Sequence, residues 1–210
     1  MKPKSTARTF ATAAVLSAGA LFTSTGYAQT NNAFLRLFQD FSTSNQSTRF
    51  DGAVYAMANG EAANTVVATG RRDDGSLSLI GSFATDGKGA AFDGGEGLDP
   101  LISAYALEAT SNQRFLISVN AGSSTITAFR VNSDHSLTRT GSSFTFGIGP
   151  NSLAVRGDAI VVTNIDADGE FNGEPDQEGS MIAFRLTRFG SLVPIFSTYR
   201  TLENLSLIHI

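Results

Sequence analysis

Residues 114–146, RFLISVNAGSSTITAFRVNSDHSLTRTGSSFTF, decide the fold, because this stretch recurs twice more in the chain. It begins with an apolar run, turns at Asn120-Ala121-Gly122, resumes with a second β-rich run, and turns again between Asn132 and His135. Short runs rich in Val, Ile, Phe and Thr, separated by Asn, Gly, Ser and Asp, are typical of strands joined by hairpins. The stretch therefore predicts antiparallel β-structure, and no helical periodicity competes with that interpretation.

The two other copies are VYAMANGEAANTVVATGRRDDGSLSLIGSFATDG upstream and AIVVTNIDADGEFNGEPDQEGSMIAFRLTRFGSLVPIFS downstream. The serines of their shared Ser-Leu pairs lie 60 and 55 residues apart, at Ser76, Ser136 and Ser191. These spacings somewhat exceed the ~40–50 residues of a four-stranded propeller blade. The surplus falls in a glycine-rich segment before Leu101 and an acidic segment after Asn164. We therefore expect an all-β fold, a β-propeller of four-stranded blades, with about three blades present.

Four regions follow from the order of these patterns. Residues 1–28 carry Lys2, Lys4 and Arg8, then an apolar stretch and a small-residue end at Ala28, which predicts a secretory signal peptide. Residues 29–51 form a polar N-terminal segment with scattered Leu and Phe, and residues 52–204 form the partial propeller. The blades are expected at about 52–83, 102–146 and 152–201.

Charge and cysteine content restrict the partners. The predicted leader removes three basic residues, so 12 basic residues face 19 acidic ones, and 12 minus 19 gives a net charge of −7. Such a balance argues against nucleic acid or an anionic membrane as a partner. The sequence has no Cys, so it has neither a disulfide framework nor a lipoprotein anchor. We expect a periplasmic or extracellular protein.

The last residues, 205–210, read LSLIHI and resemble the translation of an adapter used in shotgun sequencing. The alternative is a genuine apolar strand end. Propellers close with ~4–8 blades, and about three units are present here. We therefore expect a chain that is truncated at its C-terminus, with outer blades that lack neighbours.

Three motifs resemble a known family. They are the blade phrase FLISVNAGSSTITAFRV, the hairpin form in DDGSL and RFGSL, and the entry GPNSLAV. Together they look like the lactonase family of seven-bladed β-propellers, which includes 6-phosphogluconolactonase-like and carboxymuconate cyclase-like proteins. The resemblance covers roughly residues 52–201 and implies an exported bacterial member with seven blades and hydrolysis of a lactone.

Two polar residue types repeat in all three copies. The first set, at the end of equivalent strands, is expected to satisfy turn backbone and to tolerate left-handed conformations: Asn59, Asn120 and Asn164. The second set is expected to form inter-blade ion pairs or solvated stems on the third strand, away from the channel: Arg71, Arg130 and Arg185. One cation in each blade could instead surround an anionic substrate.

No nucleophilic triad is indicated. The one usable histidine is His135, since His209 lies in the adapter-like tail. His135 fills the position of Gly75 and Gly190 in the other copies, so we predict an exposed turn residue with unusual backbone angles. With no Cys and no supported Ser-His-Asp arrangement, the catalytic residues stay unidentified.

The acidic segment is the feature that does not repeat. It places six carboxylates within 166–178, and the metal ligands that we select from it are Asp166, Asp168, Glu170 and Asp176. Carboxylates at this density repel, and a hard cation such as Ca²⁺ relieves the repulsion with oxygen ligands. The spacing is not that of an EF-hand, and a solvated acidic loop is the alternative.

Two functions follow. The first is a lactonase-like β-propeller that hydrolyses a lactone, of the sugar type in the resembling family. The alternative is a non-catalytic exported propeller that binds a metabolite, a carbohydrate or a protein partner through its loops.

Overall fold

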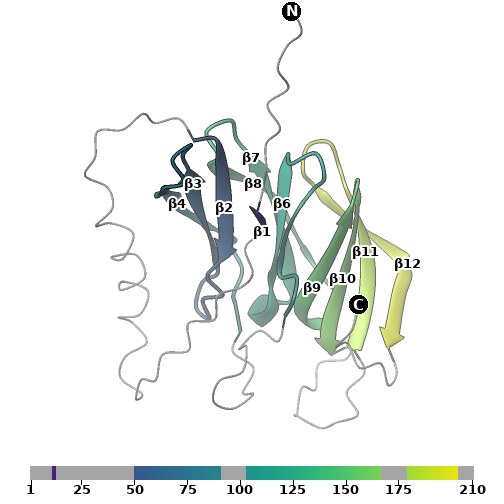
Figure 1. The fold of residues 1–210 in the computed structure, drawn as a ribbon. Coiled ribbons are helices and arrows are strands. Elements are labelled where there is room, and N and C mark those ends of the chain that lie inside the picture. Colours follow the sequence, from purple (N-terminus) through teal and green to yellow (C-terminus); the bar gives the residue numbers. More distant parts are fainter. Residues whose placement is uncertain (1–10, 13–49, 91–102, 167–178, 203–210) are drawn as a thin grey trace, which may run out of the picture.

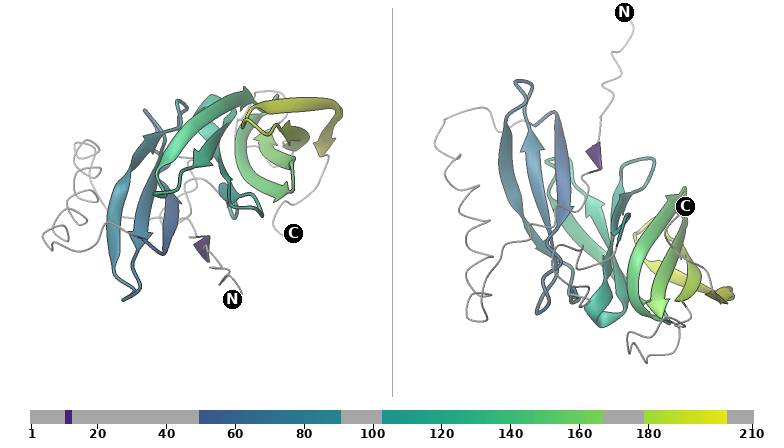
Figure 2. Two further views of the ribbon diagram at one scale, coloured as in Figure 1. Left: turned by 90° about the horizontal axis from the view of Figure 1, so that it is seen from above. Right: turned by 60° about the horizontal axis from the view of Figure 1, so that its bottom comes forward.

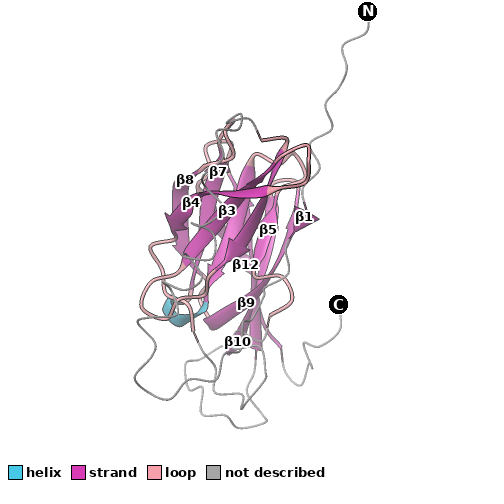
Figure 3. Cartoon of the chain, turned by 60° about the vertical axis from the view of Figure 1, so that its left-hand side comes forward, coloured by secondary structure: helices cyan, strands magenta, loops and turns pink. Residues whose placement is uncertain are grey.

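The computed structural model describes residues 11–12, 50–90, 103–166 and 179–202. The regular secondary structure in these ranges is strand, apart from one 3-10 turn, η1, which covers Ala121–Ser123 (Figure 3). The strands are β1 Ala11–Thr12, β2 Gly52–Met57, β3 Thr65–Arg71, β4 Leu77–Ala84, β5 Leu107–Ala109, β6 Phe115–Asn120, β7 Thr125–Val131, β8 Leu137–Phe144, β9 Ile148–Arg156, β10 Ala159–Asp166, β11 Gly179–Leu186 and β12 Leu192–Leu202.

These strands form three four-stranded sheets of consecutive strands, in the orders β1-β2-β3-β4, β5-β6-β7-β8 and β9-β10-β11-β12. Apart from β1, every neighbouring pair is antiparallel. Seen from above, the sheets lie side by side and fan out from one another (Figure 2), in the order of the chain (Figure 1). Sheets of four sequential strands stacked in this way are the blades of a propeller, so the predicted all-β partial propeller is confirmed.

The middle sheet explains why strands form here. All six residues of β6 are buried, because both faces of this strand are covered. Successive side chains of a strand point to opposite faces. Accordingly Phe115, Ile117 and Val119 belong to the core shared with the third sheet, whereas Leu116 belongs to the core shared with the first. The continuous apolar run FLISV is therefore the signature of a strand buried on both faces.

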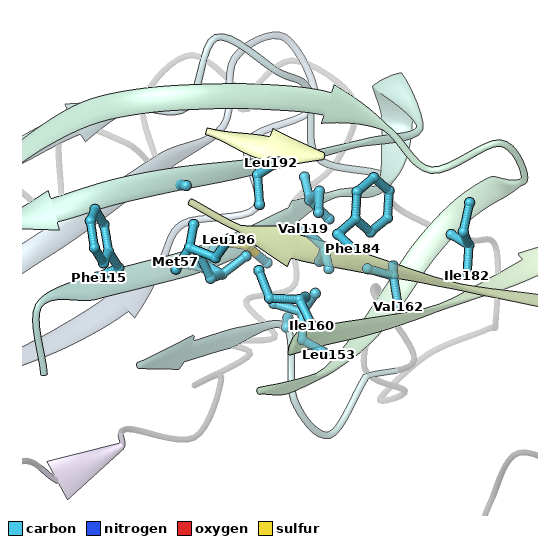
Figure 4. Close-up of a cluster of buried hydrophobic side chains, with 14 of the residues drawn as sticks. Met57, Phe115, Val119, Leu153, Ile160, Val162, Ile182, Phe184, Leu186 and Leu192 are labelled. Carbon is cyan, nitrogen blue, oxygen red and sulfur yellow. The ribbon is translucent and has the colours of Figure 1, made fainter. Parts of the chain in front are cut away.

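The two cores lie between neighbouring sheets. Between the second and third sheets, Phe115, Ile160, Phe184 and Leu192 are among the packed residues, and Met57 of the first sheet joins them (Figure 4). Between the first and second sheets, Tyr55, Val66, Leu116 and Phe129 are among the packed residues. Each sheet thus buries its apolar face against the next one, which is how a propeller is stabilised.

The hairpins between the third and fourth strands adopt one shared turn. In each of them a left-handed residue donates its N–H to a carbonyl three residues earlier: Gly75 to Arg72, His135 to Asn132 and Gly190 to Thr187, with φ of 83°, 66° and 90°. Glycine adopts this conformation at no steric cost. The predicted equivalence of His135 with the two glycines is confirmed.

The first strand of each sheet lies at the inner edge, where β5 and β9 contact each other. β9 begins at Ile148, slightly before the expected start of the third blade at 152, whereas β5 begins at Leu107, slightly after the expected start of the second blade at 102. At the same edge of the first sheet, β1 pairs with β2 in parallel, through Ala11 with Val54 and Thr12 with Tyr55. Among the residues described, no helix is long and apolar enough to span a membrane.

Candidate functional site

The inner edges of the second and third sheets are joined by polar contacts. The N–H of Leu153 on β9 donates to the carbonyl of Tyr105, just before β5, at 2.8 Å. The hydroxyl of Ser103 donates to the carbonyl of Asn151. Backbone edges that would otherwise face the channel are thus bridged from one blade to the next. This edge is the part of a propeller from which a central ligand is reached.

Glu108 lies on this edge, in the middle of β5. Its Oε2 accepts the N–H of Val155 on β9 at 3.0 Å. Its Oε1 makes no hydrogen bond to any residue that the structure describes. One carboxylate oxygen is therefore held in place by the neighbouring blade, while the second can bind another group.

Burial raises the pKa of the Glu108 carboxyl above its ordinary value, and the hydrogen bond from Val155 offsets part of that rise. The side chain is only half-buried, so it combines a desolvated position with access to solvent. A carboxylate with a raised pKa accepts a proton more readily than an ordinary one does. Such perturbed groups occur preferentially at functional sites.

Glu108 is not repeated in the third sheet. It pairs with Ile117, three residues before Asn120, and the corresponding residue of the third sheet pairs with Val161, three residues before Asn164. That corresponding residue is Ala154. The carboxylate is therefore a feature that the second and third sheets do not share. Sequence reasoning missed Glu108, although it is a lone acidic residue in the apolar stretch LISAYALEA.

Of the three repeated asparagines, only Asn120 and Asn164 occupy equivalent positions in their sheets. Asn120 pairs with Thr125 at the start of β7, and Asn164 pairs with Ser180 near the start of β11. In the first sheet the position opposite Thr65 is held by Ala58, whose N–H donates to the Thr65 carbonyl. The predicted equivalence of Asn59 is therefore wrong by one residue. Asn59 does have left-handed backbone, with φ of 50°.

The local role predicted for Asn120 and Asn164 is also wrong, because both side chains are fully buried between sheets. The Oδ1 of Asn120 accepts the Nδ2 of Asn64 at 3.0 Å, and its own Nδ2 donates to the Thr127 hydroxyl at 3.0 Å. Asn164 donates to the Thr145 carbonyl of the preceding sheet at 3.4 Å. These amides connect blades, and they form no accessible site.

Two turns of the form Thr-x-Gly, residues 85–87 and 145–147, complete this network. The Thr127 hydroxyl donates to the Thr85 carbonyl at 2.9 Å, across the junction between the first two sheets. A Cβ on Gly87 would collide with the side chain of Asn120, and one on Gly147 would lie 2.8 Å from Cγ of Asn164. Both junctions therefore need glycine beside the buried amide.

The Arg set needs a similar correction. Arg71 pairs with Leu77, as Val131 pairs with Leu137 and Leu186 with Leu192, so Arg71 is one residue out of register with Arg130 and Arg185. The two remaining arginines make different contacts. The guanidinium of Arg130 lies 5.3 Å from the ring centre of Phe115 and donates to the Phe189 carbonyl of the next sheet at 3.4 Å. Arg185 lies 3.9 Å from the carboxylate of Asp158, and both side chains are exposed.

His135 lies in the predicted turn, but the prediction of an exposed side chain is wrong. Only 5% of it is exposed, because the turn packs against the first sheet. The Tyr55 hydroxyl donates to the His135 carbonyl at 2.9 Å, and Nε2 lies 3.4 Å from the Phe50 carbonyl. Nδ1 is buried with no hydrogen-bond partner among the described residues. The imidazole belongs to the junction between the first two sheets.

The predicted metal ligands Asp168, Glu170 and Asp176 lie outside the described residues, and Asp166 is described only as the backbone end of β10. In the described ranges, no group of three or more His, Cys, Asp or Glu side chains could hold a metal ion. The calcium hypothesis therefore stays a prediction.

Solved structures provide the comparisons for this fold. A candidate 6-phosphogluconolactonase from Bacteroides fragilis is 19% identical over 66% of this chain and 33% of its own length, with a TM-score of 0.48. A second candidate from Bacteroides uniformis is 18% identical over 66% of this chain and 35% of its own length, with a TM-score of 0.48. A protein from Sulfolobus tokodaii described as selenium-binding is 13% identical over 68% of this chain and 36% of its length, with a TM-score of 0.49.

This chain thus spans about a third of the length of each of these proteins. No protein-family model matches the sequence, and no curated protein matches it. The propeller assignment rests on the three stacked four-stranded sheets of the chain itself.

Proposed function

We propose that this chain is part of an exported, lactonase-like β-propeller protein that hydrolyses a lactone, with Glu108 as the general base. The resemblance of its blade phrases to the lactonase family suggests the reaction class. The observation that carries the residue assignment is the position of Glu108, which is anchored at the inner edge through Oε2 and makes no hydrogen bond through Oε1 to the part of the chain that the structure describes. A general base needs such a fixed orientation together with an unoccupied proton-accepting atom.

In this mechanism Oε1 of Glu108 accepts a proton from a water molecule as the water oxygen attacks the lactone carbonyl carbon. The bond between that carbon and the ring oxygen then breaks. The ring oxygen leaves as an alcohol after it takes up the proton, and the product is a hydroxy acid. The hydrogen bond from Val155 to Oε2 keeps the carboxylate oriented throughout.

The test compares the complete protein with its Glu108→Gln and Glu108→Ala variants. A six-membered sugar lactone is the substrate, and the readout is the amount of base needed to neutralise the acid that hydrolysis releases. Loss of a general base lowers kcat by about 10²–10⁴-fold. Glu61→Gln is the matched control, since Glu61 is an exposed loop residue of the first sheet. Unchanged kcat in Glu108→Gln would refute the base assignment.

A non-catalytic function is the second candidate, and Tyr105 favours it. This tyrosine is 51% exposed and lies three residues before Glu108, beside the contact that joins the inner edges. An exposed aromatic ring at this edge is suited to binding a carbohydrate. If the wild-type protein bound sugars without turning over lactones, and Tyr105→Ala weakened that binding, the binding function would replace the hydrolytic one.

A further inference from the structure

Three arginines gather where the hairpin turn of the third sheet packs on the second sheet. The guanidinium carbons of Arg114 and Arg130 lie 5.9 Å and 5.3 Å from the centre of the same Phe115 ring. Arg130 also donates to the Phe189 carbonyl at 3.4 Å, and the guanidinium carbon of Arg188 lies 4.5 Å from the centre of the Phe189 ring. Two phenyl rings thus connect the three cations, which we call the arginine cluster.

The turn that carries Arg188 and Phe189 is held against the second sheet. The Thr140 hydroxyl donates to the Gly190 carbonyl at 3.0 Å, and a Cβ on Gly190 would lie 2.7 Å from Cε1 of Phe115. Packing this close fixes the turn relative to the second sheet. A ligand of the arginine cluster therefore meets side chains from two blades that are already in place, which lowers the entropic cost of binding.

The third sheet has an ion pair at the position where the second sheet has two cations. Arg185 contacts the carboxylate of Asp158, which directly precedes the residue opposite Arg185 in the neighbouring strand. In the second sheet, the residue that directly precedes the one opposite Arg130 is Arg114. The position that neutralises a cation in one blade thus adds a second cation in the other.

The hairpin turns show the same reversal of charge. The two residues before the left-handed residue of the turn are Asp73-Asp74 in the first sheet, Ser133-Asp134 in the second and Arg188-Phe189 in the third. Acidic residues at these positions are therefore replaced by a cation and an exposed aromatic ring only in the turn of the third sheet. The arginine cluster is a local departure from the repeated unit.

No carboxylate among the described residues neutralises the arginine cluster. The two ion pairs in that part of the chain involve Arg139 and Arg185. Arg114 and Arg188 are exposed, and Arg130 is half-buried. Like charges that lie close together repel, and a bound anion relieves the repulsion. A guanidinium that stacks on a ring still presents its N–H edge, and this edge matches a carboxylate in a bidentate geometry.

We propose that the arginine cluster, together with the ring of Phe189, binds a small carboxylate-bearing sugar. The guanidinium groups bind the carboxylate, and the Phe189 ring, which is 63% exposed, packs against the apolar face of the sugar ring. The whole chain is acidic, with a formal net charge of −4, which disfavours an extended polyanion on the same surface. This inference does not depend on the proposed hydrolysis or on Glu108.

Calorimetric titration of the full chain with glucuronate tests the proposal, with glucose as the neutral control. We expect saturable binding of glucuronate that weakens as NaCl is added, and no binding of glucose. Arg130→Gln should weaken the binding about tenfold or more, because it removes charge-assisted hydrogen bonds. Arg185→Gln is the matched control and should bind as wild type does, since this arginine already has a carboxylate partner.

Three outcomes of that titration would overturn the proposal. They are no binding of glucuronate to the wild-type protein, equal binding of glucose, and tighter binding of inorganic phosphate than of glucuronate. The first would remove the site, and the other two would remove the carboxylate-bearing sugar as its ligand.

A charge reversal separates the site from the stability of the fold. Arg114→Asp gives the second sheet the ion pair that the third sheet has, so we expect glucuronate binding to be lost while the melting temperature stays at least as high as that of wild type. Phe189→Ala should weaken the binding without changing its dependence on NaCl, because the ring carries no charge. Undiminished binding of glucuronate in Arg114→Asp or in Arg130→Gln would contradict the inference.

Discussion

Asp86 and Phe146 occupy the same middle position of the two Thr-x-Gly turns, and both have left-handed backbone, with φ of 57° and 60°. Each side chain reaches the outer strand of the next sheet. Asp86 forms an ion pair with Arg139 of β8, whereas the Phe146 ring packs edge-on against Phe196 of β12 with ring centres 4.8 Å apart. The same left-handed turn thus positions two chemically different contacts between neighbouring blades.

The two junctions should respond differently to salt. Asp86→Asn keeps a residue that tolerates left-handed backbone and removes an exposed ion pair, so we expect a loss below about 1 kcal/mol that disappears in high salt. Phe146→Ala should cost about 0.5–1.5 kcal/mol at every salt concentration, because an aromatic contact is not screened. Urea unfolding at low and high NaCl measures both, and a salt-independent effect of Asp86→Asn would contradict the ion pair.

Substitutions of two turn glycines distinguish the cost of backbone strain from the cost of disturbed packing. Gly75 and Gly190 have φ of 83° and 90°, but a Cβ on Gly75 would meet nothing within 4 Å, whereas one on Gly190 would collide with the Thr140 side chain. Gly75→Ala should cost about 1–2 kcal/mol from strain alone. Gly190→Ala should cost about 1–3 kcal/mol more, because the turn must move off the second sheet. Equal losses in chemical unfolding would show that the hairpin is not packed as described.

The buried amide of Asn120 should contribute more to the free energy of unfolding than an accessible turn amide does. Asn120→Ala removes the acceptor of one N–H of the Asn64 amide and the donor to the Thr127 hydroxyl inside the junction, although Asn64 still donates to Val119 and Thr127 to Thr85, which predicts a loss of about 1–3 kcal/mol. Asn132→Ala removes an amide that bonds to the Ser136 and Thr138 hydroxyls in a solvent-accessible turn, so it should cost less than about 1 kcal/mol. A reversed order in denaturant unfolding would refute the network.

Glu108 should make stability fall as pH rises. Because burial raises the pKa of this carboxyl above 4.5 in the folded protein, the unfolded chain ionises first. Above that ordinary pKa the unfolded state binds fewer protons, so the free energy of unfolding decreases until the folded pKa is passed. Glu108→Gln retains an acceptor for the Val155 N–H. We therefore expect this variant to gain stability relative to wild type as pH rises above the ordinary pKa of the carboxyl, with urea unfolding as the measurement.

Asp134 is the control of opposite sign for that experiment. Hydrogen bonds from the side chain and backbone of Ser136 lower the pKa of its carboxyl. Its contribution is present above the ordinary pKa and is lost as pH falls through the folded value. The free energy of unfolding of Asp134→Asn should therefore be lower than that of wild type near neutral pH, and the two values should converge as the pH falls. If Glu108→Gln behaved in the same direction, the desolvation of Glu108 would be disproved.

The calcium hypothesis has a direct test. If residues 166–178 bind Ca²⁺, added Ca²⁺ should raise the melting temperature of the protein, and Asp168→Asn should abolish the increase. Mg²⁺ at the same concentration is the control for a general effect of divalent charge. No change with Ca²⁺ would leave a solvated acidic loop as the correct interpretation.

The sequence by itself determined the repeated unit and its strands. Runs such as FLISV, turn residues such as Gly75 and Gly190, and the spacing of the Ser-Leu pairs are local signals, since propensity and turn chemistry act within a few residues. They were sufficient for four-stranded sheets in chain order and for a left-handed turn at His135. The same local patterns could not set the register to the exact residue, which is why Asn59 and Arg71 were assigned one position away.

The tertiary structure alone decided what the polar residues do. The burial of His135 and Asn120 arises from the packing of one sheet on the next, and the sequence of a single blade carries no signal for that contact. The same holds for Glu108, because burial at the inner edge raises the pKa of its carboxyl and the Val155 N–H, 47 residues away in the chain, offsets part of that rise. Desolvation and hydrogen bonding between distant segments are properties of the packed sheets, so they appear only once the sheets are assembled.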